Sequence, residues 1–536
     1  MSEWWRGAVI YQIYPKSFCD TNGDGVGDLR GILERLPYIA DLGVDAIWLS
    51  PFFTTPMHDS GYDVSDFCDV DPIFGTLDDF DELLAEAHRL GLRLIIDQVY
   101  SHSSIDHPWF AESASGRDNP KADWYVWADP KPDGSPPNNW QSVFNGAAWT
   151  WNARRRQYYL HNFLAEQPDL NLHNPAVQDA MLDVARFWLD RGVDGFRLDA
   201  ANFYMHDPGL RDNPPSGVRD APRPYDYQAH VYSRSRPESL AFVARIRALL
   251  DSYSARFAVA EIGDHSAVDE VISYANGPER CHSAYSFVFL EAEAPTATLV
   301  REAIAPWQEV AATAWPSWAF SNHDAPRVVS RWARTAAERD DPRFAVLLNH
   351  LLCALRGTVF LYQGQELGLP QANLRFEDLR DPEAVANWPH TLGRDGARTP
   401  MPWTAAAPHA GFSTAKPWLP MDAAHVPLAV DRQMGESSSV LEQTRAFLHL
   451  RRTMPALTRG AMTMRAAPEP LIAFARSGTG GEILCVFNPE PAEVRWEKAL
   501  PNGDRPPTIA TRAGGCRCEG DDIVLSAYGW MLLSLS

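Results

Sequence analysis

Acidic residues follow three short strand-like segments of this chain, and their types suit nucleophilic and acid–base chemistry. In GFRLDA, Arg197 and Asp199 lie two residues apart, so on a strand both side chains point to one face. A neighbouring guanidinium lowers a carboxyl pKa, so we expect Asp199 to be ionised and available as a nucleophile. Glu261, in AVAEIG, follows small or apolar residues, which raise a carboxyl pKa toward the value that an acid catalyst needs. Asp324, in SNHDAPR, supplies a third carboxylate.

Each of these acids alone has a simpler interpretation. Arg197 and Asp199 would then form a structural ion pair, Glu261 would face solvent, and Asp324 would cap a turn. Three strand-end carboxylates near one axis are harder to explain without catalysis, so the sequence favours a catalytic site.

The segment DTNGDGVGD has the spacing of a loop that binds a hard cation, with Gly25 at its sharp turn. The expected oxygen ligands come from Asp20, Asn22, Asp24, the Val26 carbonyl and Asp28. The loop departs from an EF-hand because its twelfth position is Gly31 instead of Glu. A solvated turn of Asn and Asp residues is the alternative to a metal site.

The elements that must position these residues alternate between strands and helices. Eight segments are predicted strands: GAVIYQIYPKSF, DAIWLSPFF, LRLIIDQVY, GVDGFRLDA, FAVAEIG, AYSFVFL, WAFSNHD and GTVFLYQG. A helix over 175–191 is predicted from the cap Asn174, Pro175 at its first position and the stop Gly192. Thr76 and Asp79 predict the start of another helix, which closes at Gly91. This alternation favours an α/β fold, a (β/α)8 TIM barrel with its active site at the carboxyl ends of the strands.

A doubly wound sheet is the rival fold. It needs a glycine-rich phosphate turn after the first strand, where this chain has aspartates that repel phosphate. Residues 101–173 lack helical periodicity and predict a subdomain inserted after the third strand. Residues 1–100 and 174–460 would form the barrel, and 461–536 a C-terminal antiparallel β-sandwich.

Composition excludes several classes of function. The 536 residues include 48 Lys and Arg against 69 Asp and Glu, and the net charge of −21 argues against nucleic acid as a partner. Seven mostly isolated cysteines suit a reducing, cytoplasmic location. We expect no signal peptide, and no apolar segment has the ~20 residues of a membrane helix.

With these motifs in order, the chain resembles the α-amylase family, glycoside hydrolase family 13, and within it the α-glucosidase and oligo-1,6-glucosidase branch. The resemblance covers essentially the whole chain and also rests on DQVYSH, DSGYD, QPDLN and GRDGARTPMPW. It implies Asp199 as nucleophile, Glu261 as general acid/base and Asp324 as the carboxylate that grips sugar hydroxyls. It implies a substrate site formed by Asp59, Tyr62, His102, Phe163, Arg197, His323 and Arg394, with Arg398 ranked lower. It also favours one structural Ca²⁺ in the 20–28 loop, with Mg²⁺ as the other candidate, and no organic cofactor.

The activity implied is a retaining α-glucosidase that removes or transfers the nonreducing-end glucose of short substrates, as a monomer or homodimer. Isomerases of disaccharides share the same carboxylates and are the chief alternative. Noncatalytic transporter ectodomains of the family carry a membrane helix and lack the catalytic carboxylates, and a sugar-binding module would not explain filled nucleophile and acid positions.

Three departures bear on specificity. Gln98 and Ser101 replace residues that are common in this family. Ala200, after the nucleophile position, is neither the Val associated with α-1,6 links nor the Thr of many α-1,4 enzymes. QPDLN favours α-1,6 activity, whereas the small Ala200 leads us to expect α-1,4 substrates such as maltose. The long segment 201–238 is expected to cap the acceptor side and favour transfer.

Overall fold

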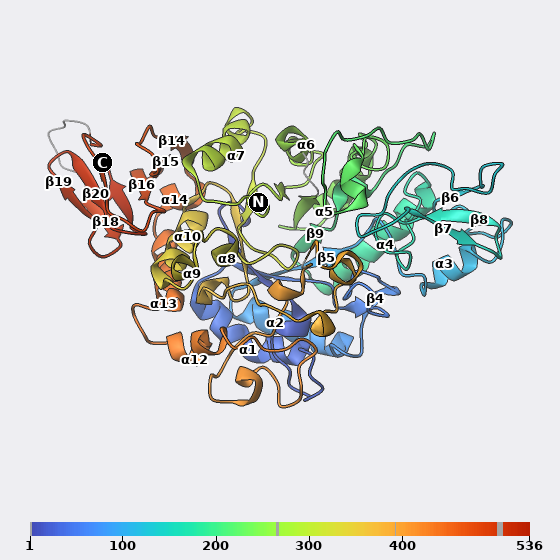
Figure 1. Ribbon diagram of the computed structural model, residues 1–536, viewed down its shortest axis with the longest axis horizontal. Helices are drawn as coiled ribbons and strands as arrows, with labels where there is room; N and C mark the ends of the chain where they lie inside the picture. Colours follow the sequence, from blue (N-terminus) through green and yellow to red (C-terminus); the bar gives the residue numbers. More distant parts are fainter. Residues whose placement is uncertain (1–2, 264–266, 392, 501–507, 536) are drawn as a thin grey trace.

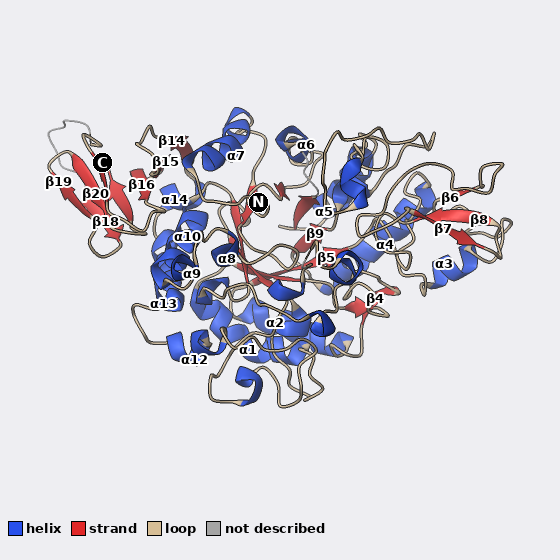
Figure 2. Ribbon diagram, viewed as in Figure 1, coloured by secondary structure: helices blue, strands red, loops and turns tan. Residues whose placement is uncertain are grey.

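The computed structural model describes residues 3–263, 267–391, 393–500 and 508–535, and a ring of parallel strands lies at its centre (Figures 1 and 2). The strands run in the order β11-β10-β9-β5-β2-β1-β13-β12. A parallel bridge between Ala284 and Pro316 joins the two ends of the sheet. The bounds are β1 (Val9–Ile13), β2 (Ala46–Leu49), β5 (Arg93–Gln98), β9 (Gly195–Leu198), β10 (Phe257–Ile262), β11 (Ser283–Ser286), β12 (Ser317–Ala319) and β13 (Thr358–Tyr362). All eight predicted strands and the barrel prediction are confirmed.

Helices surround the ring because each buries one apolar face against the strands. The long ones are α1 (Leu29–Leu42), α2 (Leu77–Arg89), α4 (Pro175–Arg191), α5 (Ser239–Asp251), α7 (Ala297–Glu309), α10 (Pro342–Ala354) and α13 (Val440–Arg452). Shorter ones are α3 (Pro108–Ser113), α6 (Val268–Ser273), α8 (Val328–Arg331), α9 (Ala336–Arg339), α11 (Pro382–Asn387), α12 (Val430–Gln433) and α14 (Pro455–Arg459).

The two predicted helix starts are confirmed. The Asn174 side chain accepts a hydrogen bond from the Ala176 amide at the start of α4, and Gly192 ends the helix at φ 106°. Thr76 and Asp79 form a reciprocal capping box at the start of α2. Local side-chain chemistry therefore fixes where the helices that lead into β9 and β5 begin.

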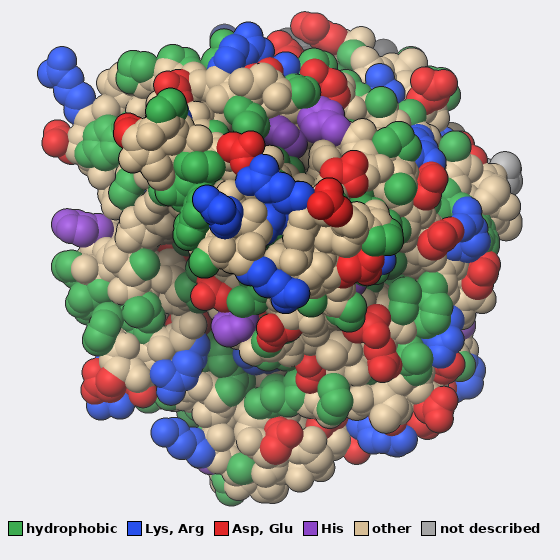
Figure 3. Space-filling model, turned by 90° about the vertical axis from the view of Figure 1, so that its right-hand side faces the viewer, with side chains coloured by type: hydrophobic (Ala, Val, Ile, Leu, Met, Phe, Trp, Pro, Cys, Tyr) green, Lys and Arg blue, Asp and Glu red, His purple; other side chains and the backbone are tan. Residues whose placement is uncertain are grey.

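Between β5 and α4, the chain leaves the barrel and forms a small antiparallel sheet. Its strands are β6 (Trp127–Ala128), β7 (Trp149–Asn152) and β8 (Gln157–Leu160), in the order β6-β8-β7, packed over the buried Trp140. A hairpin of β3 (Phe53–Thr54) and β4 (Asp66–Val70) precedes this region. In Figure 1 the inserted sheet lies at the opposite end of the molecule from the C-terminal strands, and Figure 3 shows this end, with acidic and basic side chains interspersed.

The C-terminal strands form two antiparallel sheets. One has the order β14-β15-β16-β21-β18 and the other β17-β20-β19, with an apolar cluster between them. The bounds are β14 (Ala461–Met464), β15 (Ile472–Gly478), β16 (Gly481–Phe487), β17 (Val494–Trp496), β18 (Thr508–Arg512), β19 (Arg517–Glu519), β20 (Asp522–Leu525) and β21 (Trp530–Ser534). None of the described helices is both long and apolar enough to cross a membrane.

One buried arginine ties the C-terminal sheets to the barrel, and a second ties the preceding helix α13 to it. Arg476, on β15, donates to the backbone carbonyl of Ala354 at 2.6 Å, at the end of α10. Arg451, on α13, donates to the carbonyls of Gly7 at 2.6 Å and Cys353 at 2.8 Å. Both guanidinium groups satisfy carbonyls that burial would otherwise leave without a donor.

Candidate active site

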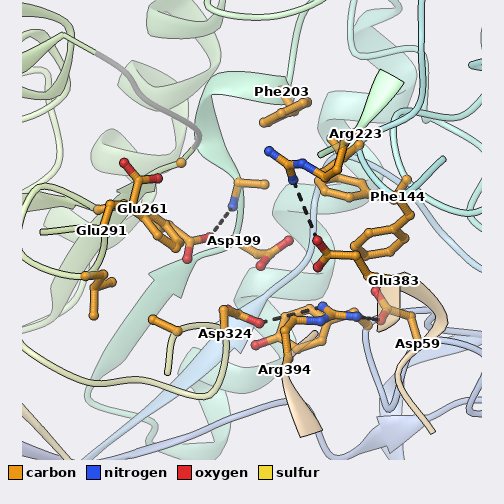
Figure 4. A pocket seen from close by; sticks show the side chains of 18 of the residues that line it. Asp59, Phe144, Asp199, Phe203, Arg223, Glu261, Glu291, Asp324, Glu383 and Arg394 are labelled. Atoms are coloured by element: carbon orange, nitrogen blue, oxygen red, sulfur yellow. Dashed lines mark hydrogen bonds and ion pairs between the residues drawn. The ribbon is translucent and has the colours of Figure 1, made fainter. Parts of the chain in front are cut away.

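The three predicted catalytic carboxylates converge on one cavity at the carboxyl ends of the barrel strands (Figure 4). Asp199 follows β9, Glu261 lies near the end of β10, and Asp324 follows β12. The cavity has a volume of about 470 Å³, within the range of small-ligand pockets. Of the predicted residues, its lining includes Asp59, Tyr62, His102, Phe163, Asp199, Glu261, Asp324 and Arg394. The remaining two, Arg197 and His323, lie behind this lining in contact with it.

Arg197 holds the acids of β5, β9 and β10 in one cluster. Its Nη1 donates to Asp199 Oδ1 at 2.6 Å and to Asp97 Oδ1 at 2.5 Å, and its Nη2 pairs with Glu261. The Ala200 amide donates to Glu261 Oε2 at 3.0 Å, and Tyr285 donates to its other oxygen at 3.1 Å. One guanidinium therefore orients both candidate catalytic carboxylates from the same side.

The charge balance of this cluster overturns one expectation. Burial raises the pKa of Asp199 well above its usual range, and repulsion from Glu261 and Asp97 adds to it, outweighing the attraction of Arg197. Burial likewise raises the pKa of Asp97 to about 7 despite its contact with Arg197. Arg197 does lower the pKa of Asp199, but the net shift is upward, so the prediction that Arg197 keeps the free Asp199 ionised is wrong. Three carboxyls share a single cation, so the cluster retains a proton near neutral pH.

Asp324 lies in the opposite electrostatic environment. Burial raises the pKa of this carboxyl, but the contact with His323 and the guanidinium groups of Arg398 and Arg394 outweigh burial and hold the pKa well below its usual range. Arg398 Nη2 donates to Asp324 at 2.8 Å, and Arg394 Nη1 lies 3.6 Å away. Asp324 is therefore ionised and able to accept hydrogen bonds from hydroxyl groups.

A neutral histidine links Asp324 to the rest of the site. Burial lowers the pKa of His323 to about 3. The Gln12 amide donates to His323 Nδ1 at 2.8 Å, so the ring proton sits on Nε2, which lies 2.6 Å from the Tyr62 hydroxyl and 3.2 Å from Asp324. Tyr62 in turn donates to Asp97 at 3.2 Å. This chain of hydrogen bonds fixes the Tyr62 ring, which lines the cavity.

A buried ion pair forms the wall across the cavity from Glu261. Arg394 Nη2 lies 2.7 Å from Asp59 and 2.7 Å from Asp381, and Gln167 donates to the second Asp59 oxygen at 3.1 Å. Gln167 also lies 3.1 Å from His102 Nε2, so the QPDLN motif contacts the site directly. Asp59 is only 3% exposed. This wall therefore offers fixed polar groups to a ligand and is closed by packed side chains.

Sequence reasoning missed several lining residues outside the barrel strands, namely Phe144, Phe203, Arg223, Glu291, Arg331 and Glu383. Arg223 and Glu383 face each other at 3.9 Å across the cavity wall (Figure 4). Phe203 and Arg223 belong to the long segment 201–238, which therefore reaches the cavity, whereas its role in capping the acceptor side stays a prediction. The length of that segment was the available signal, but nothing in it pointed to a partner 160 residues away.

The predicted cation loop is organised around its own backbone. Asp20 accepts from the Gly23 and Gly25 amides at 2.7 and 2.8 Å, and Asp28 accepts from Thr21 and Gly31 at 2.8 and 2.6 Å. Asp24 accepts from the Val26 amide at 2.8 Å and from the Asn22 side chain at 3.1 Å. Within the described ranges, no three acidic, His or Cys side chains converge as a metal site. These hydrogen bonds account for the turn without a cation but leave lone pairs of the same carboxylates available, so the predicted five-ligand cation site stays a prediction.

Comparison with known proteins agrees with this geometry. The family model for the α-amylase catalytic domain matches residues 12–460. A probable α-glucosidase of Rhizobium meliloti is 55% identical over 494 residues, covering 91% of this chain and 89% of that protein. An oligo-1,6-glucosidase of Heyndrickxia coagulans is 36% identical and covers 91% of this chain and 92% of its own. The crystal structure of the α-glucosyl transfer enzyme XgtA superposes with a TM-score of 0.94 at 49% identity, covering 99% of both chains. The chain therefore belongs to the α-amylase family, glycoside hydrolase family 13.

Proposed function

We propose that this protein is a retaining, exo-acting α-glucosidase that cleaves and transfers the nonreducing-end glucose of short α-glucosides, with α-1,4 links such as that of maltose favoured. The observation that carries this proposal is the buried wall of Asp59, Arg394 and Asp381 facing the carboxylate cluster. A terminal glucose would direct its 4-hydroxyl end at this wall. A longer chain would have no path beyond it, so cleavage would occur one residue from the end.

The carboxylates support a two-step mechanism. Asp199, ionised, would attack the anomeric carbon while Glu261 donates its proton to the departing glycosidic oxygen, giving a covalent β-glucosyl-enzyme. Glu261 would then remove a proton from water or an acceptor hydroxyl, which attacks the same carbon and releases Asp199. Retaining enzymes keep their two carboxyls about 5–5.5 Å apart. One guanidinium in contact with both Asp199 and Glu261 supports such a short separation.

The proton for the first step is available in the cluster. Because the pKa of Asp199 and that of Asp97 are raised, the ligand-free cluster holds a proton near neutral pH. In the transition state, positive charge develops at the anomeric carbon beside Asp199, which favours the ionised form of this carboxyl. Asp324 would accept hydrogen bonds from sugar hydroxyls and resist protonation.

Linkage preference would be set near Ala200, which lines the cavity and whose amide holds Glu261. Its methyl group leaves space that a valine would fill. Ala200 also has a φ of 41°, in the left-handed region that β-branched residues adopt with strain. We expect the small side chain to admit a glucose whose 4-hydroxyl carries the bond.

The test compares initial rates on maltose, isomaltose, sucrose and trehalose, with products identified and their anomeric configuration followed by NMR. We expect maltose to be cleaved faster than isomaltose, with α-glucose as the first product. Ala200→Val should shift the ratio toward isomaltose, whereas Ala200→Ser, which keeps the side chain small, should not. Faster hydrolysis of isomaltose by the unmodified enzyme would favour the oligo-1,6-glucosidase alternative, and rearranged disaccharides would favour an isomerase.

A further inference from the structure

A second cavity opens beside the first on the carboxyl-end face of the barrel. Its volume is about 460 Å³, and its lining shares no residue with that of the first. Lys16, after β1, and Ser60, after β2, form one part of it. The segment after β13 contributes the rest, including Arg380, Lys416 and Trp418. The cavity is therefore built by three separate loops of the catalytic face.

Positive charge is concentrated in this cavity although the protein is acidic. The chain has five lysines, Lys16, Lys121, Lys131, Lys416 and Lys498, and two of them line this one cavity. Arg380 adds a third cation. Within the described part of the chain, neither Lys16 nor Lys416 forms an ion pair, and the one acid of the lining, Asp378, is held by Arg375 at 2.8 Å. Local positive charge thus exceeds negative charge in a chain of net charge −21.

The ammonium group of Lys16 is held in place. Its Nζ lies 4.1 Å from the centre of the Trp418 ring, a cation–π contact. The ring itself is fixed, because its Nε1 donates to Ser17 at 3.0 Å and its backbone amide donates to the Gly25 carbonyl at 2.9 Å. Lys416 and Arg380 are exposed and free to adjust around a ligand. One positioned cation and two mobile ones suit a compact anion with several oxygens.

We propose that this cavity binds a phosphate-type oxyanion, either free or as the ester of a small sugar. Lysine ammonium groups bind phosphate as point charges, and Arg380 can add a bidentate contact. The volume leaves room for a sugar attached to the phosphate. A neutral sugar alone would gain little from three cations.

The two cavities share a wall. Ser60 lines the second cavity, and its neighbour Asp59 lines the first cavity. Likewise, Arg380 lines the second cavity, and its neighbour Asp381 pairs with Arg394, which lines the first cavity. Asp59 and Asp381 are the two partners of Arg394 at 2.7 Å each. An anion that shifts segments 59–60 or 380–381 would therefore move Asp59 and Arg394, the groups proposed to bind the terminal glucose. This coupling rests on the proposed function, whereas the binding site does not.

The binding experiment uses isothermal titration calorimetry and thermal unfolding of the full chain with inorganic phosphate, glucose 6-phosphate and, as a control for ionic strength, potassium chloride. We expect saturable binding of phosphate and a rise in Tm that chloride does not reproduce. The double variant Arg380→Gln/Lys416→Gln should bind about ten-fold more weakly or worse, because each lost contact is charged. Lys131→Gln, an exposed lysine of the inserted region, is the matched control and should bind as the unmodified protein does.

Tighter binding of glucose 6-phosphate than of phosphate would identify the ester as the ligand, and equal binding would identify the free anion. Binding no stronger than that of chloride, or equal binding by the double variant, would overturn the site. In the kinetic arm, saturating phosphate should change the KM for maltose about five-fold or more in the unmodified enzyme but not in the double variant. If phosphate binds saturably but leaves the KM unchanged, the coupling is refuted and the binding site stands. If the enzyme is inactive on α-glucosides, the proposed function is refuted, and calorimetry still tests the binding site.

Discussion

Replacing Asp199 with asparagine should abolish activity and at the same time stabilise the fold. The amide keeps the size of the carboxyl and can still accept a hydrogen bond from Arg197, so the packing of the cavity is retained. It cannot form the covalent intermediate. We expect kcat/KM to fall at least about 10³-fold, which corresponds to about 4 kcal/mol of transition-state stabilisation.

The stability gain follows from the charge balance around Arg197. Burial and the repulsion of Glu261 and Asp97 raise the pKa of Asp199, so its ionised form is unfavourable in the folded state. For Asp97, the pKa of about 7 against the usual ~3.9 of an aspartate corresponds to about 4 kcal/mol between its two protonation states, which indicates the electrostatic strain in the cluster. Removing one negative charge relieves part of this strain. We expect Asp199→Asn to raise the free energy of unfolding by about 1–2 kcal/mol at pH 8.

The pH dependence gives the sign of this effect. A carboxyl whose pKa is raised on folding stabilises the protein at low pH, and that contribution is lost as the pH rises through the folded-state pKa. Asparagine does not titrate, so the advantage of the variant over the unmodified protein should be small at pH 5 and larger at pH 8. Urea unfolding at both pH values measures it, with Asp183→Asn on the exposed face of α4 as the control. The reasoning would be refuted if the variant were less stable than the unmodified protein at pH 8 and if this difference in stability were larger at pH 8 than at pH 5.

Three further results are expected. Glu261→Gln should lose activity by several orders of magnitude on substrates with poor leaving groups but much less on activated aryl glucosides, which need no proton; equal losses on both would contradict its role as an acid. Soluble starch should lose viscosity slowly relative to glucose released, because cleavage occurs at chain ends; rapid loss of viscosity would show internal cleavage. EDTA should lower the Tm if the 20–28 loop holds the predicted cation, and added Ca²⁺ should restore it; a Tm that EDTA leaves unchanged would contradict the cation site.

Local chemistry explains why the fold was predictable from sequence. The capping residues Asn174 and Thr76 mark where α4 and α2 begin. The barrel strands are short apolar runs that end in polar residues. The candidate catalytic acids follow those strands, so their convergence at one end of the barrel required only the fold. These signals lie within a few residues of the features that they predict.

The remaining features depend on segments that are distant in sequence. Arg223 and Glu383 lie close together, although they belong to the separate segments that follow β9 and β13. Nothing in the sequence of either segment indicates a contact with the other. The pKa of Asp199 could not be predicted from Arg197 alone, since burial and the acids of two other strands decide it. The cation site predicted from the spacing of Asp20 and its neighbours is a different case: carboxylates at alternate positions can bind a cation or cap a turn, and the hydrogen bonds within the turn do not decide between the two.

The arginine contacts at the base of the barrel make the C-terminal sheets part of one cooperative unit. Arg476 satisfies the backbone carbonyl of Ala354 at the end of α10, so detaching the sheets would leave that carbonyl buried without its donor. A chain cut after α14 would therefore lose more than a surface module, since the helix that precedes β13 would lose a hydrogen-bond donor for its final turn. The C-terminal sheets thus complete the hydrogen bonding of a barrel helix, although they lie far from the catalytic face.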